Sequence, residues 1–184
     1  ISEVILNSSS REELKSILSI SPEKLRNIKG VQPGIENILK TLPGVSINNE
    51  MSTQYSVRGG NFDENLIYVN GIEIYRPFLI RSGQQEGLSF INSEMIDDIK
   101  FSSGGFEAIY GDKMSSVLDI KYKSPTTNKY HLNSSLFGGS FTSENISKNN
   151  SISNILGIRY RDNSLLVNSK ETNSNFKPSF LDLQ

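Results

Sequence analysis

The sequence predicts an α+β domain, a small mixed sheet with short helices, followed by a run of longer strands. Between residues 11 and 123, helix and strand signals are mixed without a regular βαβ repeat, which is typical of α+β folds. Beyond the breaker-rich segment 124–128, the strand-like segments become longer and richer in Ser, Asn and Gly. We therefore expect a leader over residues 1–10, the α+β domain over 11–123, a linker over 124–128 and strands over 129–184.

Composition argues against several classes of function. The formal net charge of −1 offers no basic field for nucleic acid. The chain has no Cys, which excludes disulfides, thiolate metal sites and cysteine catalysis. Its only His is His131, and most metal and acid–base chemistries recruit histidine. We therefore expect no enzyme, no metal and no cofactor, and we interpret His131 as a solvated or lumen-facing strand residue.

The first part of the α+β domain carries one strand signal and two helix signals. Residues 14–20 fit a strand better than a helix. Ser21-Pro22-Glu23 has the N-cap, N1 and first-turn residues of a helix that would run to about Ile28. A second helix opens at Pro33-Gly34 and ends at Pro43-Gly44. Its apolar face consists of Ile35, Ile38, Leu39 and Leu42.

Short strands and one explicit hairpin follow these helices. Residues 66–69 and 72–75 are rich in strand formers and flank Asn70-Gly71, which favours a type I′ turn because both central residues must accept positive φ. After the hairpin we expect a long loop over residues 76–90 and one helical turn over 92–97. The other predicted strands cover residues 45–47, 54–58, 98–102 and 117–122.

A two-residue turn also predicts the register of the hairpin. Val69 then pairs with Ile72 and Ile67 with Ile74, so these four aliphatic side chains share one face. We expect that face to pack against the helix that carries Ile35, Ile38 and Leu39. Tyr68 and Glu73 form a pair on the other face.

The segments after residue 128 read as two long strands, residues 130 to about 142 and residues 152–160. In the second, Ile152, Leu156, Ile158 and Tyr160 share one parity, and Ser151, Ser153, Gly157 and Arg159 share the other. An apolar face opposite a polar face suits a barrel strand between lipid and lumen, and it equally suits a strand of a soluble sandwich.

No motif in the sequence indicates catalysis. The glycines after Arg58 lack the order of a dinucleotide fingerprint and no P-loop lysine follows them, so we interpret Gly59 and Gly60 as backbone devices. The carboxylates lack calcium-loop spacing. Arg58 itself has two interpretations, a surface arginine or an arginine that pairs with carboxylates on a surrounding wall.

An ordered series of segments over residues 42–123 resembles the TonB-dependent receptor plug family. The residues that match its motifs are Pro43, Gly44, Gly59, Gly60, Asn70, Gly71, Tyr110 and Gly111. The series consists of residues 42–45, 55–60, 65–75, 95–101, 104–105, 108–111 and 117–120. The sequence of residues 86–92 resembles that of family members from the Bacteroidetes group.

The resemblance implies a fold and a site. Residues 11–123 would form a plug inside a barrel of about 22 strands in the bacterial outer membrane. Residues 129–184 would be the first antiparallel strands of that transmembrane β-barrel, here truncated. The leader would contain the TonB box, for which the candidates are Glu3, Val4, Ile5 and Leu6. Arg58 would face glutamates of the barrel wall as a plug–barrel contact.

The resemblance also implies a function and partners. The chain would gate energised uptake of a nutrient of the siderophore, vitamin or glycan class. Its partners would be a TonB-type periplasmic energy-transducing protein, the nutrient ligand and outer-membrane lipid, and the family leaves room for a surface lipoprotein.

The alternative is a soluble α+β ligand- or protein-binding module of the bacterial envelope. That alternative requires residues 129–184 to close a core with the rest of the chain. An enzyme would require a convergent polar site.

Overall fold

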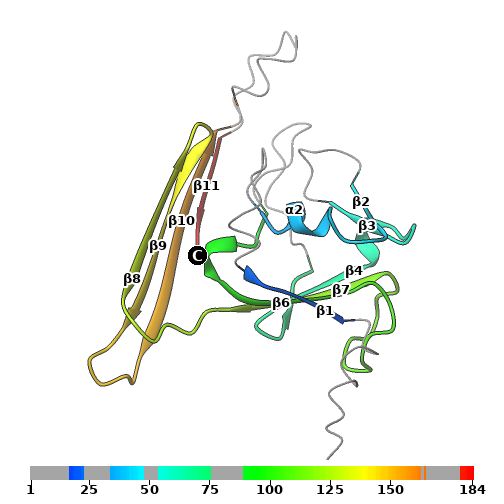
Figure 1. Ribbon diagram of the computed structural model, residues 1–184, viewed down its shortest axis with the longest axis horizontal. Helices are drawn as coiled ribbons and strands as arrows, with labels where there is room; N and C mark the ends of the chain where they lie inside the picture. Colours follow the sequence, from blue (N-terminus) through cyan, green and yellow to red (C-terminus); the bar gives the residue numbers. More distant parts are fainter. Residues whose placement is uncertain (1–16, 23–33, 48–53, 76–88, 163, 165–178) are drawn as a thin grey trace, which may run out of the picture.

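The computed structural model describes residues 17–22, 34–47, 54–75, 89–162, 164 and 179–184 (Figure 1). Two large sheets organise these residues, and Figure 1 shows them side by side. The mixed sheet has the order β1-β6-β7-β4-β5, and the four-stranded sheet has the order β11-β10-β9-β8. The predicted fold class, a mixed α+β unit followed by antiparallel strands, is therefore confirmed.

The mixed sheet is formed by strands that lie far apart in the sequence. Strands β4 and β7 run parallel, and the other pairs are antiparallel. Its strands are β1 (Ile17–Ile20), β4 (Asn65–Val69), β5 (Ile72–Glu73), β6 (Ile96–Ser102) and β7 (Ser116–Tyr122). Strand β7 lies in the middle and carries Leu118 and Ile120, both fully buried. This strand therefore links the two halves of the sheet.

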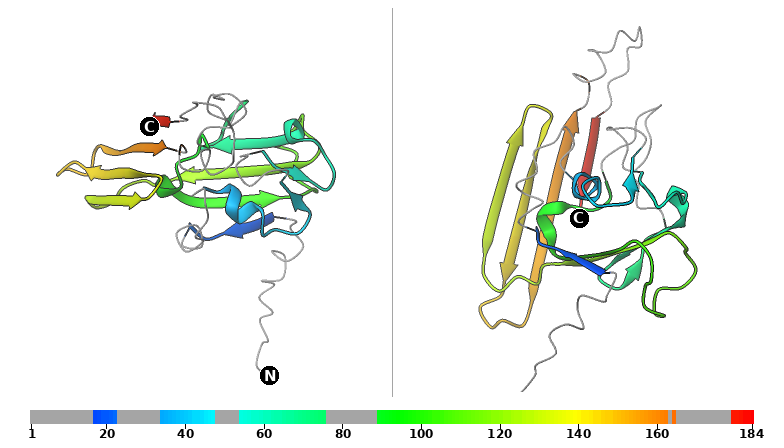
Figure 2. Two further views of the ribbon diagram at one scale, coloured as in Figure 1. Left: turned by 90° about the horizontal axis from the view of Figure 1, so that it is seen from above. Right: turned by 45° about the vertical axis from the view of Figure 1, so that its right-hand side comes forward.

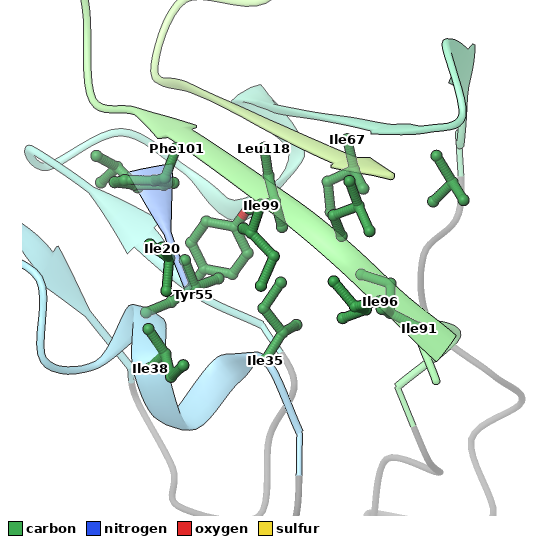
Figure 3. Packing of buried hydrophobic residues seen from close by; sticks show 14 residues of the cluster. Ile20, Ile35, Ile38, Tyr55, Ile67, Ile91, Ile96, Ile99, Phe101 and Leu118 are labelled. Carbon is green, nitrogen blue, oxygen red and sulfur yellow. The ribbon is translucent and has the colours of Figure 1, made fainter. Parts of the chain in front are cut away.

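One face of the mixed sheet is covered by helix α2 (Glu36–Leu39) and a small antiparallel pair, β2 (Val45–Ser46) and β3 (Ser56–Val57). Ile35, Ile38 and Leu39 have helical spacing, and all three side chains pack into the core. Figure 3 shows Ile35 and Ile38 close to Tyr55 and Ile99. The predicted apolar face of this helix is thus confirmed for those three residues. The predicted end at Pro43-Gly44 was wrong, because the helix ends at Leu39 and Leu42 packs against the core from the turn that follows.

The hairpin adopts the predicted turn and most of the predicted packing. Asn70 and Gly71 have φ of 52° and 78°, as a type I′ turn requires. Val69 pairs with Ile72 and Tyr68 with Glu73. The Ile74 amide donates to the Ile67 carbonyl at 2.8 Å.

The expectation that all four aliphatic side chains are buried was wrong. Ile67 and Val69 lie in the core and Ile74 packs against it, but Ile72 is 68% exposed. Strand β5 is two residues long and forms the edge of the sheet, so Ile72 extends beyond the layer that covers the core.

The opposite face of the mixed sheet is also partly covered. Leu66 and its parallel neighbour Val117 are both buried there. Beside them the rings of Tyr68 and Tyr110 meet edge to face, with centroids 5.4 Å apart. The Tyr110 hydroxyl donates to Asp119 Oδ2 at 3.0 Å, which ties the connection between β6 and β7 to this face.

The four-stranded sheet follows in simple antiparallel order, as expected of strands that pair beside the mixed sheet (Figure 2). The prediction of a single strand over residues 130 to about 142 was wrong, because the chain reverses at residues 136–137. Gly138, at φ 142°, lies against the backbone of Tyr160 and Arg161, where a Cβ would not fit. The strands are β8 (Lys129–Ser135), β9 (Gly138–Ile146), β10 (Ser153–Asp162) and β11 (Ser179–Leu183).

Other local predictions have different outcomes. The strand predicted over residues 14–20 is confirmed where it is described, as β1, and the helical turn over 92–97 is the 3₁₀ helix η3 (Ser93–Met95). Pro22 is helical, but the rest of the helix predicted to reach Ile28 lies outside the described residues. The leader and residues 76–88 of the loop predicted over 76–90 also lie outside them.

Candidate functional site: the contact between the two sheets

The four-stranded sheet has one apolar and one polar face, and the apolar face is exposed. Leu132, Phe141 and Leu183 share a face in the strand register with Ile158. Leu132 is 83% exposed, and Leu183 is 67% exposed. Other exposed apolar side chains of the same face are Tyr130, Leu156, Tyr160 and Leu181.

The polar face of this sheet is turned toward the mixed sheet and is largely buried. Its side chains include Thr142, Glu144, Gly157, Arg159, Arg161 and Asp182. A sheet of a soluble sandwich buries its apolar face, whereas a barrel strand turns it to lipid. The observed orientation is that of a barrel strand.

Arg159 on β10 is the centre of the contact. Its Nη1 donates to the Ile91 carbonyl and its Nη2 to the Ser89 carbonyl, both at 2.9 Å. A longer bond of 3.4 Å joins Nη2 to the Phe90 carbonyl. Asp182 on β11 accepts from Nε at 2.9 Å and from Nη2 at 2.5 Å. The guanidinium therefore binds the neighbouring strand and the mixed-sheet unit simultaneously.

Gly157 gives the close approach that this contact needs. A Cβ at Gly157 would overlap the side-chain amide of Asn92 and lie 2.9 Å from Met95 Sδ. Both residues belong to the turn of η3, and Asn92 caps η3 by accepting from the Glu94 amide at 3.2 Å. A Cβ at this position would therefore force the buried side chains of Asn92 and Met95 to shift away from β10.

Two further polar contacts, from Lys123 and Tyr122, join the mixed sheet to the four-stranded sheet. Lys123, just after β7, binds Glu144 Oε1 on β9 at 2.8 Å, and His131 Nε2 on β8 lies 3.6 Å from the same oxygen. His131 thus lies on the inner face of its sheet. The Tyr122 hydroxyl donates to Gln184 at 3.3 Å, and burial raises the pKa of Tyr122.

Arg58, the predicted wall contact, lies away from this interface. It is exposed, has φ of 50°, and its amide donates to the Gly44 carbonyl at 2.8 Å. Within the described residues it makes no ion pair. Its role as a plug–barrel contact stays a prediction, and the TonB-box candidates 3–6 lie outside the described residues.

Three glycines of the motif have a conformational or steric reason, and the other motif residues differ in their surroundings. Gly44 and Gly59 have φ of 81° and 82°, and a Cβ at Gly60 would collide with Ser115. Pro43 and Gly111 are exposed. Burial and the Asp119 carboxylate together raise the pKa of Tyr110 to about 12.

A family model described as the TonB-dependent receptor plug domain matches residues 9–117, more than half of the chain. The chain belongs to this family. Residues in the matched range form the mixed sheet up to the start of β7, and the four-stranded sheet follows the plug domain. Comparison with curated proteins gives no match.

Solved structures share this fold. The outer membrane transporter YddB from Escherichia coli matches with a TM-score of 0.61 and 13% identity over 80% of this chain and 26% of its own. The hemophore receptor HasR of Serratia marcescens, solved with its hemophore HasA and heme, matches with a TM-score of 0.58 and 18% identity, covering 85% of this chain and 25% of its own.

The ferric enterobactin receptor PfeA of Pseudomonas aeruginosa, solved with enterobactin, matches with a TM-score of 0.56 and 16% identity, covering 80% of this chain and 24% of its own. The chain thus spans about a quarter of the length of each of these structures. Among the described residues, no helix is long and apolar enough to cross a membrane.

The residues at the centre of the plug contact were not predicted from the sequence. Gly157 and Arg159 were placed on the polar parity of their strand without a role. One signal was present: an arginine two positions from a glycine on the polar side of a strand with an apolar opposite side. Asp182 and the carbonyls of residues 89–91 had no comparable signal, because main-chain acceptors have no sequence signature.

Proposed function

We propose that the chain is the plug, with the first barrel strands, of an outer-membrane TonB-dependent transporter that gates energised uptake of a nutrient. The chain lies in the bacterial outer membrane. Residues 11–123 act as the plug, residues 124–128 as the linker and residues 129–184 as the start of the wall. The chain acts as a gate and not as an enzyme, and the nutrient belongs to the siderophore, vitamin or glycan class.

The orientation of the four-stranded sheet supports this function most strongly. Its apolar side chains face away from the plug and its buried charges face toward it. In a transmembrane barrel the apolar face contacts lipid, and the polar face contacts the plug that fills the lumen. The soluble-module alternative needs residues 129–184 to close a core with the rest, which would turn the apolar face inward.

The leader is assigned the contact with the protein that supplies the energy. We propose that Glu3, Val4, Ile5 and Leu6 pair as an added strand with a TonB-type periplasmic protein, where backbone hydrogen bonds give the affinity. Arg58 is assigned to a carboxylate of the barrel wall. Water can take over the hydrogen bonds of such polar contacts when they are pulled apart, whereas it cannot replace the packing of an apolar core.

The leader provides the test of this function. A peptide of residues 1–10 should bind the C-terminal domain of the periplasmic energy-transducing protein. Val4→Pro should abolish binding, because proline removes a backbone donor from the added strand. Val4→Ala keeps that donor and is the matched control, which should still bind. Titration calorimetry decides the point, and equal binding by the Pro and Ala variants would contradict the assignment.

A further inference from the structure

Every hydrogen bond from Arg159 to the described part of the plug ends on a main-chain oxygen atom. Its plug partners are the carbonyls of Ser89, Phe90 and Ile91, and its side-chain partner Asp182 belongs to the wall. The side-chain amide of Gln184, at the end of the described chain, also donates to the Phe90 carbonyl. The wall therefore presents a set of donors to one extended stretch of plug backbone.

The two charges at this contact, Arg159 and Asp182, form an ion pair within the wall itself. The side chains of Arg159 and Asp182 are only 11% and 9% exposed, and they neutralise each other. Asp182 uses Nε and one Nη2 proton, so donors of the guanidinium remain directed at the plug. A buried donor without an acceptor is costly, which favours occupation of these donors by carbonyls of the plug.

Shape complements these hydrogen bonds. Gly157, two residues before Arg159 on the same face, leaves the space into which Asn92 and Met95 fit. The hydrogen bonds hold residues 89–91, and the space at Gly157 receives the turn that follows them. Together they fix residues 89–95 against β10 and β11.

We propose that Gly157, Arg159, Asp182 and Gln184 form a clasp that holds plug residues 89–95 on the barrel wall and keeps the gate closed. The role in gating rests on the proposed transport function, whereas the clasp itself does not. Its bonds are polar and water can replace them, whereas the core beneath β7 is apolar. The clasp therefore releases before the mixed sheet loses its core.

Hydrogen exchange on the full receptor in detergent, without any periplasmic partner, tests the clasp. Arg159→Lys keeps the positive charge but loses the planar set of donors. Amides of residues 89–95 should exchange about tenfold faster or more, as expected when hydrogen bonds to a charged group are lost. Amides of β7 should be unchanged. Tyr160→Phe, on the same strand but the opposite face and 49% exposed, is the control and should match the wild type.

A second variant tests the same clasp through shape. Gly157→Ala leaves every donor in place but adds a Cβ that overlaps Asn92, so it should accelerate exchange in the same segment. Wild-type exchange rates over residues 89–95 in both variants would overturn the clasp.

Conductance in planar bilayers tests the gating role. Arg159→Lys and Gly157→Ala should each raise the ion conductance of the receptor above that of the Tyr160→Phe control. Faster exchange with unchanged conductance would overturn the gating role. Failure of the leader peptide to bind its partner would overturn the transport function and leave the exchange result unaffected.

Discussion

Val69 and Ile72 are a cross-strand pair in the hairpin, yet their surroundings differ. Val69 is 8% exposed and lies in the plug core, whereas Ile72 is 68% exposed. Val69→Ala should lower the free energy of unfolding by about 1–3 kcal/mol, as for other large-to-small core changes. Ile72→Ala is the matched control, and it should cost roughly 0.5 kcal/mol or less, as at exposed sites.

Chemical denaturation of the 184-residue chain in detergent, followed by circular dichroism, measures both changes. Glu73→Ala should resemble Ile72→Ala, and Gly71→Val should be worse because a β-branched residue resists the φ of 78°. A larger loss for Ile72→Ala than for Val69→Ala would show that the assignment of the buried position is wrong.

Tyr110 carries a pH dependence with a defined sign. Burial and the Asp119 carboxylate raise its pKa in the fold to about 12, above the ordinary value of 10.0. The protonated phenol is therefore favoured in the folded state. Its contribution to stability is fully present below pH 10 and should be lost as the pH rises from about 10 to about 12.

Tyrosine-specific NMR titration of the plug tests this. Asp119→Asn should lower the pKa of Tyr110, because the charge that opposes the phenolate is gone. Glu107→Gln removes a smaller contribution and should lower that pKa less. An unchanged pKa of Tyr110 in Asp119→Asn would contradict the assigned cause.

At the scale of single elements, the sequence predicted turns with explicit chemistry and missed one without it. Asn70-Gly71 specified both the turn type and the register of its hairpin. The turn at residues 136–137 went unnoticed because Leu136 and Phe137 continue the strand-like run into Gly138 and Gly139. The reversal that Gly138 permits at φ 142° was therefore not recognised.

The prediction of buried faces failed at the edges of elements. Alternation along β5 correctly placed Ile72 on the face shared with Val69, but no sequence signal indicated that β5 would end the sheet. Tyr68 was placed on the less apolar face, yet Leu66, which lies on that same face, is 1% exposed beside its buried neighbour Val117. Burial at such positions depends on elements distant in sequence.

At the scale of the whole molecule, the plug and the first wall strands were predicted from the family resemblance, and the contact between them was not. The alternation in residues 152–160 defined two faces but fitted a barrel and a sandwich equally. The decision came from the side on which the plug lies, since Arg159 and Glu144 face it while Leu156 and Tyr160 do not. Strand alternation contains no information about which partner covers each face.

The central claim is that the apolar face of the four-stranded sheet contacts lipid. Spin labels placed on the full receptor in bilayers at Leu132→Cys and Leu181→Cys, which are 83% and 75% exposed, measure this directly. We predict that both labels collide more with oxygen, which concentrates in lipid, than with a water-soluble nickel chelate. A label at Lys148→Cys, in the exposed turn between β9 and β10, should show the reverse. Preference for the nickel chelate at both Leu132 and Leu181 would contradict the account.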